Sequence, residues 1–218
     1  MLIIFCVTFI GMMGFGIILP LFPFYAERMG ASPEVITLTM AAFSLGQFIA
    51  APYWGRLSDS IGRKKTLAIT LLGSGISYVI LAYAPTLTIV ILSRVLSGLM
   101  AGNIAVAFAY VSDITTDENR SAGLGKVSAG LGLGFMVGPA IGGMLAGNSV
   151  ESANYLLTAL SAAAINFIAM FAALFFLKES LDDSSKKPFE GLSKIINLET
   201  FKPSKIIHTV FGGRKENS

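Results

Sequence analysis

The sequence predicts an all-α membrane protein with six transmembrane helices packed in one bundle. Hydrophobic residues make up 54% of the chain and charged residues only 13%, and the mean hydropathy is +0.71. The apolar residues gather in blocks of about twenty, the length needed to cross a hydrocarbon core ~30 Å thick. Each block is expected to be helical because lipid offers no partners for unpaired backbone groups.

Six such blocks follow one another, separated by short polar loops. The first is too long for a cleavable signal peptide and no basic segment precedes it, so it is expected to remain as a span. The short loops place the six helices in one bundle, residues 1–177, followed by a linker and tail, residues 178–218. The expected spans, to within a few residues, are Leu2–Tyr25, Pro33–Trp54, Thr66–Ala84, Thr86–Val111, Ala122–Ala146 and Ala153–Leu177.

The loop charges predict the orientation of the bundle. Fourteen lysines and arginines lie in the loops, membrane edges or tail of one side, and only Arg28 lies in a loop of the other. Positive charge gathers on the cytoplasmic face, so both termini are expected to be cytoplasmic, in the plasma (inner) membrane. The pI near 9.0 then reflects contact with the anionic inner leaflet of the lipid bilayer, and no nucleic acid partner is expected.

A dense polar segment, residues 55–65, separates the second and third blocks. Its four cations and one carboxylate cannot remain in hydrocarbon, so it is expected to be a short cytoplasmic turn. The pattern resembles the GxLaDrxGrkxxl signature of the major facilitator superfamily of secondary transporters. The resemblance implies a gating latch in which Asp59 faces the positive end of a helix in another half, whereas ordinary topology-setting charge is the alternative. The latch residues are Gly55, Asp59, Gly62, Arg63, Lys64 and Asp113.

Arg94 is the only ionisable side chain deep inside a predicted span. It lies eight residues into the fourth block, about 12 Å from the outer end, where a cation costs at least ~2.5 kcal/mol. It is therefore expected to line a polar cavity, although a snorkelling arginine or one bonded to a carbonyl is the alternative. Its surroundings, Leu92–Gly102, resemble the lxxxRxxxG signature of the same family, in which the arginine is implicated in proton coupling. No carboxylate is expected at mid-membrane depth.

The fifth block carries a glycine at every fourth position, which places these glycines on one helix face. Small residues at this spacing let helices approach closely, and packing alone explains the pattern. The segment also resembles gxxxGPxxGG, a pattern of the antiporter branch, in which the proline removes a donor and bends the helix. The antiporter-motif residues are Gly130, Gly134, Gly138, Pro139, Gly142 and Gly143.

The first block ends in Gly16–Pro23, which looks like the first-helix pattern of drug exporters. With four signatures in the family's order, the chain resembles the N-terminal half of drug:proton antiporters of the tetracycline and multidrug type. Gly11 and Ser77 stand where tetracycline exporters carry acidic residues, which favours hydrophobic or cationic substrates over tetracycline–metal complexes. The resemblance implies a substrate cavity lined by Phe15, Gln47 and Phe135, although core packing explains each phenylalanine equally well.

The predicted function is proton-coupled efflux of small lipophilic or cationic compounds by alternating access. The energy source is the proton gradient and no cofactor is expected. The partner is the C-terminal half of the transporter or a second copy of this chain. The alternative is a truncated membrane protein that binds or regulates a full-length relative without transporting. An enzyme is not expected because the sequence shows no catalytic motif, and its single cysteine, Cys6, allows no disulfide framework or cysteine-based metal site.

Overall fold

A computed structural model of the chain describes residues 1–147, 153–182 and 186, and within them all regular structure is helical. Most of the predicted tail, residues 178–218, lies outside the described residues. The helices are α1 (Leu2–Ile18), α2 (Phe22–Arg28), α3 (Pro33–Ile61), α4 (Arg63–Ala82), α5 (Leu87–Met100), α6 (Asn103–Asp113), α7 (Asp117–Ala146) and α8 (Tyr155–Phe176).

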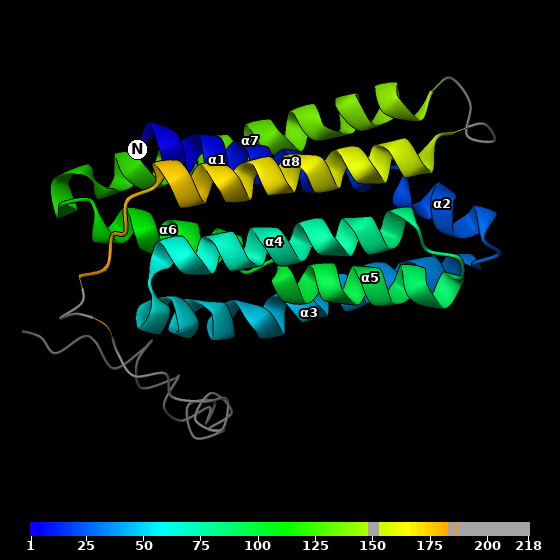
Figure 1. The fold of residues 1–218 in the computed structure, drawn as a ribbon, viewed down its shortest axis with the longest axis horizontal. Helices are drawn as coiled ribbons and strands as arrows, with labels where there is room; N and C mark the ends of the chain where they lie inside the picture. The colour runs from blue at the N-terminus through cyan, green and yellow to red at the C-terminus, as the bar shows by residue number, and fades with distance from the viewer. Residues whose placement is uncertain (148–152, 183–185, 187–218) are drawn as a thin grey trace, which may run out of the picture.

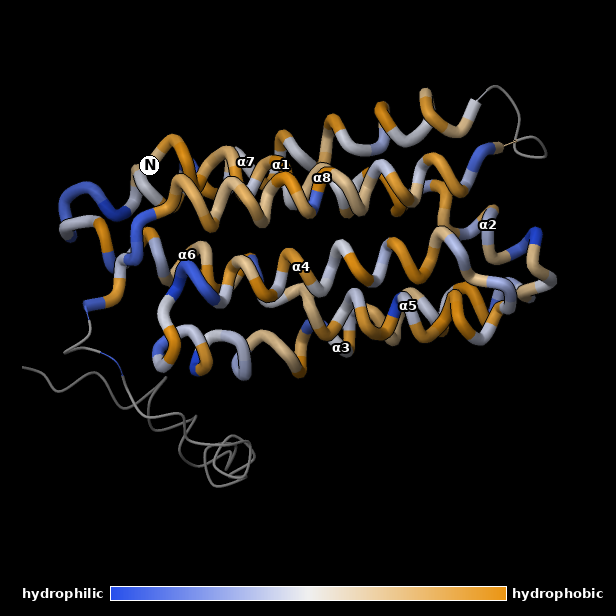
Figure 2. Tube along the Cα trace, viewed as in Figure 1, coloured by the Kyte–Doolittle hydropathy of each residue, from blue (hydrophilic) through white to orange (hydrophobic). Residues whose placement is uncertain are grey.

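Six helical segments of the described chain are long and apolar enough to cross a membrane, which confirms the predicted all-α architecture. Figure 2 shows that the hydropathy is mostly high along the helices, while hydrophilic residues gather at the two ends of the bundle. Large apolar side chains such as Leu38, Leu45 and Phe48 lie exposed on the outside of α3, as expected for a surface in contact with lipid. The six segments are Leu2–Arg28, Pro33–Ile61, Arg63–Ala82, Leu87–Asp113, Asp117–Ala146 and Tyr155–Phe176.

The helices lie lengthwise beside one another in two groups (Figure 1). In one group α1 packs against α7 and α8, and in the other α3 packs against α5, while α4 joins the groups through its long contact with α8. The start of α1, the α3–α4 and α6–α7 turns and the end of α8 all lie at the same end of the bundle. The predicted topology requires these segments to share one side of the membrane.

The buried core is divided into two apolar clusters, one toward each end of the bundle. The cluster near the N-terminus includes Ile4, Leu71 and Val111. The second cluster includes Ile17 and Phe22, along with parts of α4, α5 and α8. Gly11 of α1, Ser74 of α4 and Asn166 of α8 lie between the clusters, where they line a space that no side chain fills.

Two of the predicted spans are interrupted rather than continuous. The first breaks between α1 and α2 at Pro20, which has no N–H to continue the helical hydrogen bonds. The fourth breaks between α5 and α6 at Ala101 and Gly102. There the indole Nε1 of Trp54 donates to the carbonyl of Leu99 at 2.6 Å, so a side chain satisfies a backbone group that the break would leave unpaired in lipid.

The prediction that residues 55–65 form a turn is wrong for most of the segment. α3 continues to Ile61 and α4 starts at Arg63, so the turn is the single residue Gly62. Its φ of +103° lies in a region that L side chains rarely adopt, and its N–H bonds to the carbonyl of Ser58 at 3.1 Å. Gly62 reverses the chain without a loop, so the charged residues of this segment lie on the last turns of α3 and the first turn of α4.

The glycine stripe of α7 faces α1. A Cβ at Gly134 or Gly142 would collide with the carbonyl oxygens of Phe9 or Ile17, and one at Gly138 would lie 2.7 Å from the Met13 oxygen. The absent side chains therefore let the two backbones meet directly, as small residues do between membrane helices. α7 remains a continuous helix through its internal proline, and its stripe is covered by this chain's own first helix.

We expect Gly134→Ala to lower the free energy of unfolding by about 1–3 kcal/mol, since the added methyl group overpacks the α1–α7 contact. Thermal unfolding in detergent, followed by scanning fluorimetry, measures the change. Gly132→Ala is the matched control, because a Cβ at Gly132 meets nothing within 4 Å. Equal stability of the two variants would show that α1 and α7 do not touch along this stripe.

Candidate functional site

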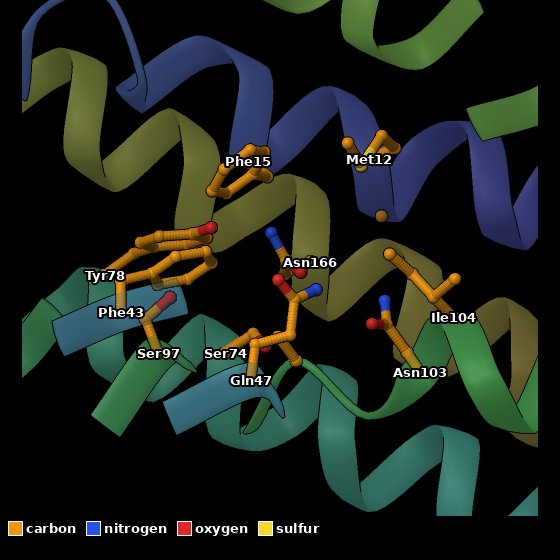
Figure 3. Close-up of a pocket in the computed structure, with 12 residues that line it drawn as sticks. Met12, Phe15, Phe43, Gln47, Ser74, Tyr78, Ser97, Asn103, Ile104 and Asn166 are labelled. Carbon is orange, nitrogen blue, oxygen red and sulfur yellow. The ribbon is translucent and has the colours of Figure 1, made fainter. Parts of the chain in front are cut away.

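A cavity of about 110 Å³ lies between the two core clusters, midway along the bundle. Six helices, α1, α3, α4, α5, α6 and α8, contribute to its wall, so the site belongs to the bundle as a whole and not to a single motif. Figure 3 shows the side chains that surround it. The lining residues are Gly11, Met12, Phe15, Phe43, Gln47, Ser74, Tyr78, Ser97, Ala101, Asn103, Ile104 and Asn166.

Three carboxamides from three different helices converge on this cavity. Gln47 on α3, Asn103 on α6 and Asn166 on α8 all line it (Figure 3). Asn166 is only 2% exposed and donates to the Ala162 carbonyl at 2.9 Å. A Cβ at Gly14 would collide with its amide nitrogen, so a glycine on α1 makes room for this polar group. A buried amide can form further hydrogen bonds with a ligand.

Of the three amides, only Gln47 was predicted, from the family resemblance. Asn166 carries a signal in the sequence all the same, because it is an amide in the middle of the apolar helix α8. Asn103 could not be recognised in this way, because its position depends on the break that starts α6 at that residue. The sequence could therefore have predicted Asn166 as a cavity residue, but not Asn103.

Aromatic rings form the other part of the wall. The Phe15 and Phe43 rings stack with centroids 5.2 Å apart and planes 20° apart, which is a common geometry for aromatic pairs. Phe135 also stacks on Phe15, with ring centroids 6.5 Å apart. It is 42% exposed and is not among the residues that line the cavity. Of the two predicted phenylalanines, the structure places Phe15 at the cavity and Phe135 in contact with Phe15.

A second cavity of about 230 Å³ adjoins the first and shares Phe15, Phe43 and Gln47 with it. Its wall includes residues of α2, α3 and α5. One of them is Arg94, the only charged residue among the described residues that line the two cavities. The further residues that line it are Leu19, Phe22, Met40, Ser44 and Arg94.

Arg94 occupies the middle of α5 and is 5% exposed. Its guanidinium carbon lies 5.2 Å from the Tyr78 ring centroid and 5.6 Å from that of Phe22, within the range of cation–π attraction. Nε and Nη2 have no hydrogen-bond partner within the described part of the chain. The structure thus places Arg94 at a cavity, and neither nitrogen bonds a neighbouring carbonyl.

A charge cluster closes the end of the bundle where α3 turns into α4. Arg63 bonds Asp59 at 2.6 Å and Asp113 at 2.9 Å, and it also donates to the Ser58 hydroxyl. The guanidinium is mostly buried while the carboxylates are partly exposed. This cluster ties α3, α4 and α6 together through one side chain.

The remaining latch residues lie around this cluster. Gly55 accepts a hydrogen bond from the Ser58 hydroxyl at 2.6 Å, and Lys64 lies on an open groove that Glu179 also lines. Asp59, expected to face a helix of another half, is engaged here by Arg63 of its own chain. Its side chain remains 37% exposed, so one face of the carboxylate is still open.

Glu179, which the sequence analysis did not assign to a site, completes the cluster. Its Oε1 accepts the backbone N–H of Arg63 at 2.7 Å, and the neighbouring Ser180 hydroxyl donates to Asp113 at 3.1 Å. A carboxylate at the first turn of α4 is stabilised by the partial positive charge of the helix N-terminus. The segment after α8 therefore seals the start of α4, and no local sequence signal relates residues 116 positions apart.

The chain is similar to known membrane transporters. A family model described as Major Facilitator Superfamily matches residues 4–213. The chain is 35% identical over 205 residues to Multidrug resistance protein 2 of Bacillus subtilis, covering 93% of this chain and 50% of that protein. It is 34% identical over 170 residues to the class C tetracycline resistance protein of Escherichia coli, covering 77% and 42%.

The fold also occurs among solved structures. The structure of the human organic anion transporter MFSD10 (TETRAN) superposes with a TM-score of 0.76 at 23% identity, over 90% of this chain and 51% of that one. At this identity the likeness shows the fold alone. In all three cases the chain spans about half the length of the relative it matches.

We expect Arg63→Gln to lower the free energy of unfolding by roughly 2 kcal/mol, a value discounted from that of a fully buried pair because Asp59 and Asp113 are partly exposed. The loss arises because two neighbouring carboxylates lose the cation between them. Thermal unfolding in detergent at low and high salt measures it.

Arg120→Gln is the matched control, since this arginine also bonds a carboxylate, Asp117, at 2.7 Å, but Asp117 is 90% exposed and the Arg120 side chain 43%. An exposed pair contributes about 0–1 kcal/mol. If Arg63→Gln and Arg120→Gln unfold at the same temperature, the Arg63 cluster does not stabilise the fold more than an ordinary surface pair.

Proposed function

Because the chain belongs to the major facilitator superfamily and is a multi-pass membrane protein, we propose that it forms the N-terminal half of a proton-coupled exporter of small lipophilic compounds. The observation that carries the proposal is the cavity midway along the bundle, lined by stacked aromatic rings, three amides and one buried arginine. The family points to transport rather than to catalysis, and the names of the relatives, multidrug and tetracycline resistance proteins, support drug efflux.

Alternating access supplies the mechanism. In this superfamily architecture two bundles rock about a site near the membrane midplane, and six helices contribute one wall of that site. The cavity of this bundle holds aromatic surface and hydrogen-bonding groups that suit a flat lipophilic molecule. The second wall, from a C-terminal half or a second copy of this chain, is part of the proposal.

The energy source is proposed to be the proton gradient. Arg94 is the one charge at the cavity, and a change in the charge or hydration near it would alter its interaction with substrate. A protonatable carboxylate at the same depth is absent from the described residues that line the two cavities. The coupling carboxylate is therefore expected in the partner half.

The charge cluster is proposed to stabilise the outward-facing state. Asp59 keeps an exposed face beside the turn at Gly62, where it can meet the positive N-terminal end of a partner helix. When the halves rock, that external contact breaks while the internal pairs with Arg63 remain. The antiporter-motif helix α7 would move together with α1, because their backbones are in direct contact along the glycine stripe.

We expect the end of the bundle that carries the charge cluster to be cytoplasmic in the plasma membrane. In a Cys6→Ser background, an impermeant thiol reagent applied to intact cells should label Ser32→Cys and spare Ser121→Cys. Both positions are exposed, and permeabilised cells provide the control in which both react. Labelling of Ser121→Cys from outside would reverse the assigned orientation.

We expect the chain of residues 1–218 to insert as a monomer without exporting drug, because one bundle cannot alternate access alone. Efflux of a fluorescent lipophilic compound should appear on co-expression with a matching C-terminal half, or when cross-linking shows an orientation-matched dimer. A protonophore should abolish it.

Robust efflux by a demonstrably monomeric chain would contradict the half-transporter proposal. Absence of efflux with every partner would instead favour the second candidate, a non-transporting membrane protein that binds or regulates a full-length relative. The two candidates are thus separated by a single assay with and without the partner half.

A further inference from the structure

We propose that the paired cavities bind lipophilic organic anions, with the Arg94 guanidinium as the group that receives the substrate carboxylate. The inference names the substrate class of the site described above and rests on the proposed transport function. Its starting observation is that Arg94 is 5% exposed, lines the second cavity, and leaves Nε and Nη2 without hydrogen-bond partners in the described part of the chain.

The charge balance of the site favours an anion. Among the described residues that line the two cavities, Arg94 is the only charged one, and the rest are apolar, aromatic, hydroxyl or amide side chains. In this bundle by itself, a cationic substrate would therefore approach an uncompensated positive charge in a medium of low dielectric constant, where like charges repel strongly. An anion would instead neutralise it. The contribution of this half to the site therefore favours acids over cations.

The two unpaired nitrogens also have the right geometry. In an arginine side chain, Nε–H and the adjacent N–H of Nη2 point in the same direction along one edge of the planar guanidinium. That edge is the fork that binds both oxygens of a carboxylate in parallel hydrogen bonds. Leaving two such donors buried and unpaired is unfavourable. Both nitrogens are closed to solvent in this conformation, so a carboxylate in the cavity satisfies both once the guanidinium turns this edge toward it.

The surroundings hold the guanidinium where it can serve this purpose. The rings of Tyr78 and Phe22 lie 5.2 and 5.6 Å from its central carbon, so cation–π attraction fixes its plane without occupying its donors. None of the described residues that line the two cavities is a carboxylate that could compete for it.

The aromatic and amide residues of the two cavities suggest what the uncharged part of the ligand looks like. Phe15 and Phe43 stack beside the space that both cavities share, and Gln47 is the third residue common to the two. A flat aromatic ring can pack against the phenylalanines while its carboxylate extends toward Arg94. The substrate class is thus an aromatic carboxylic acid of about two fused rings, in its ionised form.

Equilibrium binding to the purified 1–218 chain in lipid nanodiscs tests this with radiolabelled 2-naphthoate at pH 7.5, where the acid is ionised. Competitors are the neutral 2-naphthamide, the cationic 2-naphthylmethylamine and the aliphatic octanoate, and empty nanodiscs correct for partitioning. We expect naphthoate to bind about 10- to 100-fold more tightly than naphthamide, as for hydrogen bonds to a charged group. The amine should be the weakest, and octanoate should bind at least about tenfold more weakly than naphthoate.

The variants assign the effect to one residue. Arg94→Gln should remove the preference for the acid over the amide, and Arg94→Lys should restore only part of it, because an ammonium group lacks the planar fork. Arg56→Gln is the matched control, since Arg56 is an exposed arginine remote from both cavities, and it should bind naphthoate like the parent chain. If Arg94→Gln does not fold, the ligand series on the parent chain still decides the matter.

Equal affinity for acid and amide, tighter binding of the amine, or an acid preference that survives in Arg94→Gln would each overturn the proposal. Octanoate binding as tightly as naphthoate would overturn the aromatic part and point to lipid-derived acids. These outcomes are distinct from failure of the transport function. A chain that binds naphthoate through Arg94 but never exports retains the anion site, whereas export of cations without acid binding retains transport and excludes the anion site.

Discussion

The hydrocarbon interior of a membrane admits neither unpaired backbone groups nor uncompensated charge, and this constraint organises the whole molecule. It requires every span to be helical and it confines most ions to the helix ends. Where the fourth span breaks, the Trp54 indole bonds the Leu99 carbonyl that the break releases. Where Arg63 enters the bundle, Asp59 and Asp113 bond it on two sides. The buried charge of Arg63 is therefore paired.

Arg94 is the exception, and its position links the constraint to function. It is buried midway along α5, is held by aromatic rings, and keeps two donors free within the described chain. A stable fold has no need of such a group, since an apolar residue of similar size would avoid the burial cost. The proposed function gives a reason for this cost, since a substrate or a group of a partner half could pair with Arg94 at the cavity beside it.

The rigid parts of the bundle surround this site. On one side α1 and α7 meet backbone to backbone along the glycines, and Gly14 leaves room for the amide of Asn166. At the end of the bundle, Glu179 and Ser180 bind the start of α4 and Asp113. The polar cavity thus lies between two apolar clusters, and the contacts of Glu179 and Ser180 hold the helices together at one end of the bundle. Both features favour a bundle that moves as one body.

The sequence alone determined the six spans, the glycine stripe and the unusual depth of Arg94, because hydropathy, helical spacing and charge are local properties. Phe15 and Gln47 followed from resemblance to a family and lie at the cavity. The break in the first span also has a local cause, since Pro20 lacks the N–H that would continue the helix. Tertiary structure alone decided the break in the fourth span, the convergence of Asn103 and Asn166 with Gln47, and the contact of Glu179 with Arg63. The geometry of these features depends on how the helices pack, which no local pattern of residues encodes.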